Sequence, residues 1–481
     1  MLFSSIPFLF YFLPVVILVY YVLSFSRLAQ NIWLFITSIF FYAWGEPKFV
    51  LIMLLSIIFN ALLGNLIEKY RNNKKTMKII LIVACVLNIG MLFVFKYLNF
   101  ILENINQLLG TDFLPTTKLS LPIGISFFTF QALSYVIDVY RGKTKAEKKV
   151  FYVGLYIAFF PQLIAGPIIQ YNDVADQIRN RVSNWKKFSV GACRFVTGLG
   201  KKILLANHFA VMADNIFNWS SIGQQFYEVP AMLAWLGAIA YTLQIFFDFS
   251  AYSDMAIGLG LMFGFKFEEN FNYPYISKSI TEFWRRWHIS LSSWFRDYVY
   301  FPLGGSRVES KDKMVRNLFI VWLLTGIWHG ANWTFLFWGM WNFIFILAER
   351  FLQYHEKNKY PVLMHIYTML VVMFGWVAFR ATDLYQAGQY FLNMFGLNNN
   401  GLYSDLAVVF IKENALWLIL GVILSTPIAK KMNFLLAERK MPRIITHAYN
   451  FAYPIAMTGL FLICIVYLAR GAYNPFIYYN F

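Results

Sequence analysis

Long apolar runs are the feature that most constrains what this chain can fold into. A helix that crosses the hydrocarbon core of a bilayer requires about 20 consecutive apolar residues, and runs of this kind recur along the whole sequence. Only 14% of the 481 residues are charged and 59% are hydrophobic, whereas soluble domains are about a quarter charged. The sequence therefore predicts an all-α polytopic membrane protein that forms a single membrane domain over residues 1–481.

The apolar runs predict candidate spans at 6–23, 31–45, 49–66, 79–98, 121–139, 150–170, 230–248, 249–265, 317–331, 333–350, 361–379, 414–429 and 448–469. Several are too short to cross a bilayer, so some are expected to be re-entrant or packed inside protein. One such run is 150–170, because Pro161, Gly166 and Pro167 interrupt a helix there. Broken backbone at membrane depth needs protein or water around it.

The positive charge is distributed in a way that predicts topology. The chain carries a formal charge of +17, and its basic residues gather at 68–75, 140–149, 179–187, 285–316 and 430–443. Each group adjoins an apolar run, which is typical of cytoplasmic loops that face anionic lipid and argues against a nucleic-acid partner. This arrangement places both termini outside the cytoplasm. Because no basic residue precedes Arg27, residues 6–23 are predicted to be a retained span and not a signal peptide.

The sequence contains few recognisable sites for a metal or a nucleophile. Its three cysteines, Cys85, Cys193 and Cys464, are far apart, so neither a disulfide scaffold nor a zinc ribbon is expected. The metalloprotease, hydrolase and P-loop motifs H-E-x-x-H, G-x-S-x-G and G-x-x-x-x-G-K-[ST] are absent. What remains is acid–base chemistry by histidine, with no metal.

His329 lies unusually deep in an apolar run. It is 13 residues from Arg316, which corresponds to about 20 Å along a helix. An ionisable side chain at that depth is costly and marks a candidate site; the alternative is a neutral histidine that stabilises a helix crossing. The neighbours that permit close approach, or that can stack or hydrogen-bond, are Gly326, Gly330, Trp328, Asn332 and Trp333.

A second histidine, His288, lies in the stretch TEFWRRWHISLSSWFRDYVYFPLGGSR, residues 281–307. On a continuous helix, spacings of three and four residues would place polar side chains on one face, namely Arg285, His288, Ser292 and Arg296. Apolar residues would cover the rest, including Trp284, Trp287 and Trp294. A re-entrant helix of this kind would suit an anionic ligand that enters from the cytoplasm. The alternative is a surface helix whose arginines lie among lipid headgroups.

Two carboxylates in an apolar context, Asp248 and Asp254, are expected to pair with the arginines of 285–296 and neutralise buried charge. A role in proton relay is the alternative. Gln131, Ser134 and Asp138 occur at helical spacing and are expected to be packing polar residues or to line a pore.

The sequence resembles the membrane-bound O-acyltransferase (MBOAT) superfamily, and within it the bacterial branch that includes alginate O-acetylation proteins. The resemblance rests on stretches in a fixed order: MLFSSIPFLFYFLP, FYAWGEPKF, LPIGISFFTFQALSYVIDVYRG, FFPQLIAGPI, FDFSAYSDMAIGLGLMFGF, NYPYISKSITEFWRRWHISLSSWFRDYVYFPLGGSR, LLTGIWHGANWTFLFWG and NPFIYYNF. It implies a ring of about 11–13 tilted transmembrane and re-entrant helices around a central tunnel, with cytoplasmic and extracellular funnels. The core motifs lie in 121–350.

The resemblance also implies a reaction and its residues. The essential histidine of the family falls on His329, in WHG, and its second histidine falls on His288, in RRWHISLS. The implied enzyme transfers acetyl from cytoplasmic acetyl-CoA across the bacterial inner membrane to an exported polysaccharide such as alginate or cellulose. This transfer uses no bound cofactor and can involve an extracytoplasmic acetyltransferase partner. The residues expected to bind or support the donor are Arg285, Arg286, Trp287, Ser292, Arg296, Trp328 and Asn332.

Two alternatives stay open. One is D-alanyl transfer from a carrier protein to teichoic acid, within the same superfamily. The other is a transporter or flippase with Asp248, Asp254 and His329 in a proton path. Transporters usually show two related halves with matching broken helices, and no internal repeat is visible here.

Overall fold

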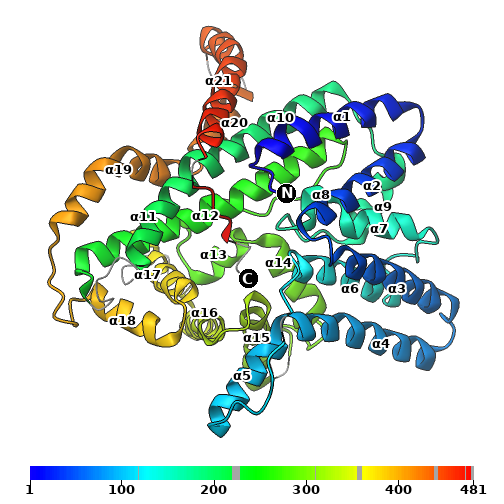
Figure 1. The fold of residues 1–481 in the computed structure, drawn as a ribbon, viewed down its shortest axis with the longest axis horizontal. Coiled ribbons are helices and arrows are strands. Elements are labelled where there is room, and N and C mark those ends of the chain that lie inside the picture. Colours follow the sequence, from blue (N-terminus) through cyan, green and yellow to red (C-terminus); the bar gives the residue numbers. More distant parts are fainter. Residues whose placement is uncertain are drawn as a thin grey trace. The chain divides into compact units, whose positions relative to one another are not determined.

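The computed structural model describes residues 1–117, 119–218, 228–308, 310–354, 360–437, 442–471 and 473–477 (Figure 1). Within these ranges every regular element is a helix, which confirms the all-α prediction. Seven helical stretches of the described ranges are long and apolar enough to cross a bilayer: Pro7–Phe25, Val50–Lys69, Lys74–Leu109, Ala231–Met262, Pro361–Arg380, Asp405–Leu424 and Ile445–Ala469. The chain is therefore a multi-pass membrane protein.

The chain divides into two compact units. Unit 1 comprises Met1–Phe195 and Ser253–Glu269, and unit 2 comprises Val196–Tyr252 and Asn270–Phe481. Helices α10 (Trp185–Gly200) and α12 (Ala231–Met262) contribute residues to both. A single domain, a ring of helices and a central tunnel with two funnels stay predictions.

Unit 1 is built largely from the first nine α-helices and short connecting turns. Its helices are η1 (Pro7–Phe12), α1 (Leu13–Val22), η2 (Leu23–Phe25), α2 (Arg27–Gly45), α3 (Val50–Lys69), α4 (Lys74–Leu92), η3 (Phe93–Tyr97), α5 (Leu98–Leu109), α6 (Ile125–Tyr140), α7 (Val150–Ala158), α8 (Phe160–Leu163) and α9 (Tyr171–Asn180). Helix α6 lies in its core, where Gln131, Ser134 and Asp138 are fully buried. Their burial agrees with a role in packing.

The predicted break in residues 150–170 is present. Helix α7 ends at Ala158, and the one-turn helix α8 follows at Phe160. Gly166 is packed so closely that a Cβ atom there would lie 2.5 Å from the Cα of Gln162. The backbone makes a tight turn at this point, as the glycine and prolines indicate.

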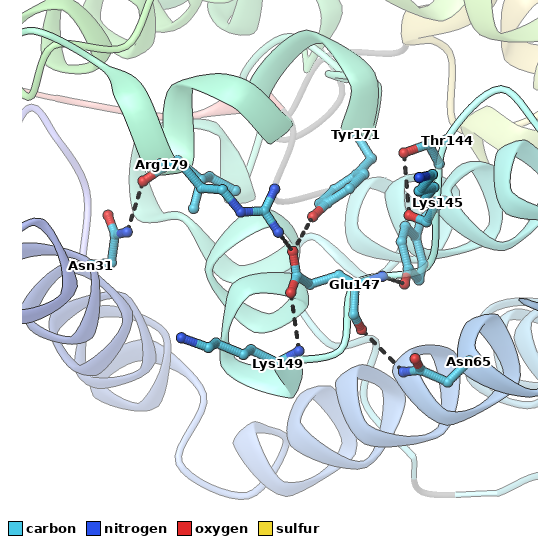
Figure 2. A network of polar contacts seen from close by, with 10 residues as sticks. Asn31, Asn65, Thr144, Lys145, Glu147, Lys149, Tyr171 and Arg179 are labelled. Atoms are coloured by element: carbon cyan, nitrogen blue, oxygen red, sulfur yellow. Dashed lines mark hydrogen bonds and ion pairs between the residues drawn. The ribbon is translucent and has the colours of Figure 1, made fainter.

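A network of polar contacts in unit 1 anchors the connection between α6 and α7 (Figure 2). The buried carboxylate of Glu147 forms an ion pair with Arg179 and accepts a hydrogen bond from the hydroxyl of Tyr171 at 3.0 Å. The backbone of the same residue donates to the hydroxyl of Tyr135 at 2.9 Å and accepts from the amide of Asn65 at 3.0 Å. One residue thereby joins α3, α6 and α9 at the basic loop 140–149.

Unit 2 contains the remaining helices. They are η4 (Lys201–Ala206), α11 (Asn207–Phe217), η7 (Pro274–Ile276), α13 (Ile280–Arg286), α14 (Ile289–Phe295), η8 (Arg296–Tyr300), α15 (Lys311–His329), α16 (Trp333–Phe351), α17 (Pro361–Arg380), α18 (Leu384–Met394), α19 (Asp405–Leu424), α20 (Ile428–Ala437) and α21 (Arg443–Ala469).

The prediction of two spans at 230–248 and 249–265 is wrong, because α12 is one continuous helix of 32 residues. The polar residues that separate the two apolar runs do not interrupt it. They are buried along the helix, Asp248 and Ser250 among them.

The expected pairing of the two aspartates with the arginines of 285–296 is also wrong. Asp248 forms a buried ion pair with Lys202 at 2.7 Å and accepts the backbone N–H of Ile477 at 2.9 Å. Asp254 pairs with Arg194 at 2.9 Å. The cations that neutralise these carboxylates therefore come from η4 and α10, upstream of α12.

Candidate active site

Helices α15 and α16 form a tightly packed hairpin that positions His329. Asn332 begins α16, because its Oδ1 accepts the backbone N–H of Thr334 at 3.0 Å. A Cβ atom at Gly326 would lie 2.6 Å from the carbonyl oxygen of Phe335, and one at Gly339 would lie 2.6 Å from that of Trp322. The two helices approach to a distance that only glycine permits, as expected at Gly326.

His329 is the last residue of α15 and is 6% exposed. Three aromatic rings meet its imidazole edge-on, with centroid distances of 4.9 Å to Trp328, 4.9 Å to Trp338 and 5.2 Å to Phe379. Gly330 follows, and a Cβ atom there would lie 2.2 Å from the ring of Phe335. The rings and the close turn together determine the plane of the imidazole.

The predicted continuous helix around His288 is wrong. Helix α13 ends at Arg286 and α14 begins at Ile289. His288 lies between them in the left-handed region, with φ 44° and ψ 56°. The backbone carbonyl of Asn270 accepts the N–H of Ile289 at 3.0 Å, and its side chain accepts the N–H of Ser290 at 3.1 Å. These bonds hold the chain in a turn, so His288 does not share a helical face with the flanking arginines.

The ring of His288 is buried near the other histidine. It is 1% exposed and meets the ring of Phe249 edge-on, with 4.6 Å between the ring centroids. The ring of Trp328 lies 6.1 Å from it, centroid to centroid, so one tryptophan adjoins both imidazoles. His288 lies outside the seven apolar spans, and burial lowers the pKa of its ring to about 3. The ring is therefore neutral at neutral pH.

A cavity of about 570 Å³ in unit 2 brings several of the predicted donor-binding residues together. Arg285, Ser292 and Arg296 line it, as predicted for one surface, although they reach it from three separate helices, α13, α14 and η8. Arg350, at the end of α16, is a third arginine in this cavity. Sequence reasoning missed it, because nothing in the local pattern connects α16 to residues 285–296.

Arg286 differs from the three arginines of the cavity because it is not among the lining residues. It forms an ion pair with Glu282 at 2.8 Å, and the cavity residue Arg296 likewise pairs with Asp297 at 2.9 Å. Burial raises the pKa of the Glu282 carboxyl, but hydrogen bonds from Lys278 N–H and Arg286 and the attraction of both positive charges leave it lowered. The carboxylate and guanidinium neutralise each other at neutral pH.

The cavity leads along α15 toward His329. Leu318, Trp322 and Thr325 line it at spacings of four and three residues, and His329 follows four residues later on the same helical face. The lining residue Trp322 also packs edge-on against Trp338, with 6.3 Å between the ring centroids, and Trp338 contacts His329. His329 thus lies about one helical turn beyond Thr325, the last residue of α15 that lines the cavity.

The remaining predicted residues occupy supporting positions. Trp287 is buried among aromatic rings, with Trp376 at 4.9 Å. Asn332 caps α16 and donates to the carbonyl of Thr382 at 2.7 Å. Trp333 is 51% exposed. Donor-binding roles for Trp287 and Asn332 stay predictions. Another histidine of the sequence, His355, lies outside the described residues.

Among the residues that the structure describes, no cluster of three or more His, Cys, Asp or Glu side chains could hold a metal ion. The groups gathered around His329 and His288 are instead aromatic rings, amides and hydroxyls, with arginines in the cavity.

The part of the chain that contains the candidate site is similar in sequence to known proteins. Residues 36–386 match the MBOAT, membrane-bound O-acyltransferase family. A probable alginate O-acetylase of Pseudomonas aeruginosa is 45% identical over 399 residues, which are 82% of this chain and 75% of the relative. A peptidoglycan O-acetyltransferase of Helicobacter pylori is 35% identical over 84% of this chain and 81% of its own length. A teichoic acid D-alanyltransferase of Bacillus subtilis is 28% identical over 53% of this chain and 68% of its own length.

The family match extends over most of the sequence and includes both buried histidines, their shared tryptophan and all the residues that line the arginine-lined cavity. On this basis the chain belongs to the membrane-bound O-acyltransferase family.

Proposed function

We propose that this enzyme transfers acetyl from cytoplasmic acetyl-CoA across the bacterial inner membrane for O-acetylation of an exported polysaccharide. The observation that carries the proposal is the position of His329, which lies in an aromatic enclosure about one helical turn beyond a cavity lined by three arginines. The names of the relatives support acetyl as the acyl group and a cell-surface glycan as the acceptor.

His329 acts as the general base in this reaction. It accepts the proton of an acceptor hydroxyl as the oxygen attacks the thioester carbonyl. The new C–O bond forms, the C–S bond breaks, and the proton passes from the imidazole to the departing thiolate. Atoms and charges balance without a metal or an oxidant.

The cavity arginines bind the donor. Arg285, Arg296 and Arg350 supply guanidinium groups that suit phosphate oxygens. With the basic loops on the cytoplasmic side, the donor enters from the cytoplasm and both termini lie on the opposite side. The acetyl group then passes to the glycan directly or through an extracytoplasmic acetyltransferase.

The comparisons favour acetyl transfer over the alternatives. Similarity to the D-alanyltransferase is lower and covers less of the chain than similarity to either O-acetyltransferase. For a transporter, Asp248 and Asp254 would have to exchange protons, and both carboxylates are engaged in ion pairs.

The test uses a strain that lacks the gene and expresses either the wild type or His329→Ala. Mass analysis of the surface polymers is expected to show acetylated glycan in the wild type and none in the variant, at equal membrane abundance. His447→Ala is a matched control, because this histidine is exposed on α21. Wild-type glycan acetylation in His329→Ala would remove this residue from the mechanism.

A further inference from the structure

Asn270 contacts both the backbone next to His288 and the ring of His288. Its backbone carbonyl accepts the N–H of Ile289 at 3.0 Å. Its side-chain Oδ1 accepts from the backbone N–H of Ser290 at 3.1 Å and from the Ser290 hydroxyl at 2.9 Å. The same oxygen lies 3.2 Å from Nδ1 of His288. Asn270 itself is fully buried.

These contacts determine the orientation of the Asn270 amide. A backbone N–H can only donate, so the atom that faces Ser290 N–H must be the oxygen and not the amide nitrogen. The Ser290 hydroxyl donates to this oxygen at 2.9 Å and lies farther from the His288 ring, at 3.5 Å. Nδ1 of His288, which lies 3.2 Å from the same oxygen, therefore faces an acceptor and must carry a proton.

We infer that Asn270 is a positioning residue that holds His288 in the Nδ1–H tautomer, with the lone pair on Nε2. This inference rests on the proposed function only for its catalytic consequence. A neutral imidazole protonated at Nδ1 accepts a hydrogen bond through Nε2 and cannot donate one there. His288 thus acts toward the substrate as an acceptor for an O–H or N–H group, and it does not polarise the thioester carbonyl.

The backbone of His288 has a left-handed conformation that neighbouring contacts must stabilise. A non-glycine residue in this conformation is strained, and the bonds from Ile289 and Ser290 to Asn270 offset that strain. Loss of the side chain could therefore disturb the turn as well as the tautomer. The test must separate these two effects.

The decisive measurement is nitrogen NMR of ring-labelled histidine in the full-length protein in lipid nanodiscs. The His288 signals are identified by their absence in His288→Gln. We expect the wild type to carry the proton on Nδ1, and Asn270→Ala to show signal from the Nε2–H form. Asn270→Asp keeps an acceptor oxygen at the same position, so it is expected to keep the Nδ1–H form.

Turnover measurements test the catalytic consequence. In acetyl transfer by reconstituted vesicles, Asn270→Ala is expected to lower turnover by about 10- to 100-fold with little change in the KM for the donor, and Asn270→Asp to retain more activity than Asn270→Ala. Asn272→Ala is the matched control, since that side chain is two residues away and exposed.

Two outcomes would overturn the inference: a proton on Nε2 in the wild type, or an unchanged tautomer in a folded Asn270→Ala. If Asn270→Ala does not fold, the wild type and Asn270→Asp still report the tautomer. Because the NMR measurement needs no substrate, a wrong proposed function would leave the tautomer result intact and would be recognised separately.

Discussion

His288 and His329 both lie against Trp328, yet different elements hold their rings in place. His288 lies in a turn between two seven-residue helices, and an amide from residue 270 contacts its backbone neighbours and its ring. His329 ends a 19-residue helix and is surrounded by aromatic rings on α15, α16 and α17. The polar contacts select a tautomer, whereas the aromatic contacts select a ring plane. The proposed roles, a base at His329 and a hydrogen-bond acceptor at His288, need both kinds of control.

The largest effect is expected from exchanging each histidine for glutamine. If His329 is the base, His329→Gln should lower turnover by about 10²- to 10⁴-fold, the usual contribution of a general base. His288→Gln should cost about 10- to 100-fold, because glutamine can still accept a hydrogen bond. Single-turnover rates of the two variants in vesicles measure the difference. Equal losses would mean that the two rings share one role.

A smaller effect is expected from Gly330→Ala, which disturbs the aromatic enclosure without touching a histidine. The added Cβ atom would overlap Phe335, which packs on Phe379 at 4.9 Å, and Phe379 contacts His329. Overpacking of this kind costs about 1–3 kcal/mol of stability. If about 1.4 kcal/mol of this cost is added to the activation free energy of the reaction, turnover should fall by about tenfold.

Gly388→Ala on α18 is the control for Gly330→Ala. Nothing lies within 4 Å of a Cβ atom at this position, and alanine favours a helix by about 1 kcal/mol over glycine. Thermal unfolding in detergent should show an equal or higher midpoint for Gly388→Ala and a lower one for Gly330→Ala. A stable and fully active Gly330→Ala would show that the enclosure does not depend on this turn.

The arginines should affect donor binding more than the chemical step. Arg285→Gln and Arg296→Gln each remove a guanidinium from the cavity, and the KM for acetyl-CoA should rise by about tenfold in each, since hydrogen bonds to charged groups contribute about 1.5–3 kcal/mol. Arg286→Gln serves as the matched comparison, because Arg286 pairs with Glu282 outside the cavity. Donor saturation curves would contradict the cavity assignment if Arg286→Gln had the largest effect.

The smallest effect on turnover is expected from Glu147→Gln in unit 1. The exchange removes the charge that pairs with Arg179 and weakens the network that joins α3, α6 and α9 (Figure 2). The free energy of unfolding in detergent should be lower by about 1–3 kcal/mol, while turnover of the folded enzyme should stay near that of the wild type. A large fall in turnover at full stability would place this network in the mechanism.

The sequence predicted the helical class, six of the seven apolar spans found in the described residues and the burial of His329, because these depend on local composition and on the distance from Arg316. It also predicted the close approach at Gly326. Each of these properties follows from residues that are neighbours in the chain.

What could not be predicted depends on partners that are distant in the sequence. The helical period around His288 indicated one helix, but Asn270, 18 residues upstream, imposes a turn. Likewise Asp248 was expected to pair with downstream arginines, while its ion pair is with Lys202. The spacing of residues within one segment contains no information about partners elsewhere in the chain. Both wrong predictions therefore concern a polar side chain whose partner is distant in the sequence.

One face of α16 contacts the ring of His329, the cavity wall and the start of α13. Trp338 packs on His329, Asn342 accepts the indole N–H of Trp284 at 2.9 Å, and Glu349 accepts the backbone N–H groups of Ile280 and Thr281. These three positions are separated by four and seven residues, so they lie along a single stripe. Under the proposed roles, the distance between the arginines that bind the donor phosphates and the imidazole of His329 is set by one rigid helix, because Arg350 also lies on α16. An acyl carrier would then be selected by the length of its arm, and a carrier whose arm is shorter by one helical turn, about 5.4 Å, would leave its thioester out of reach.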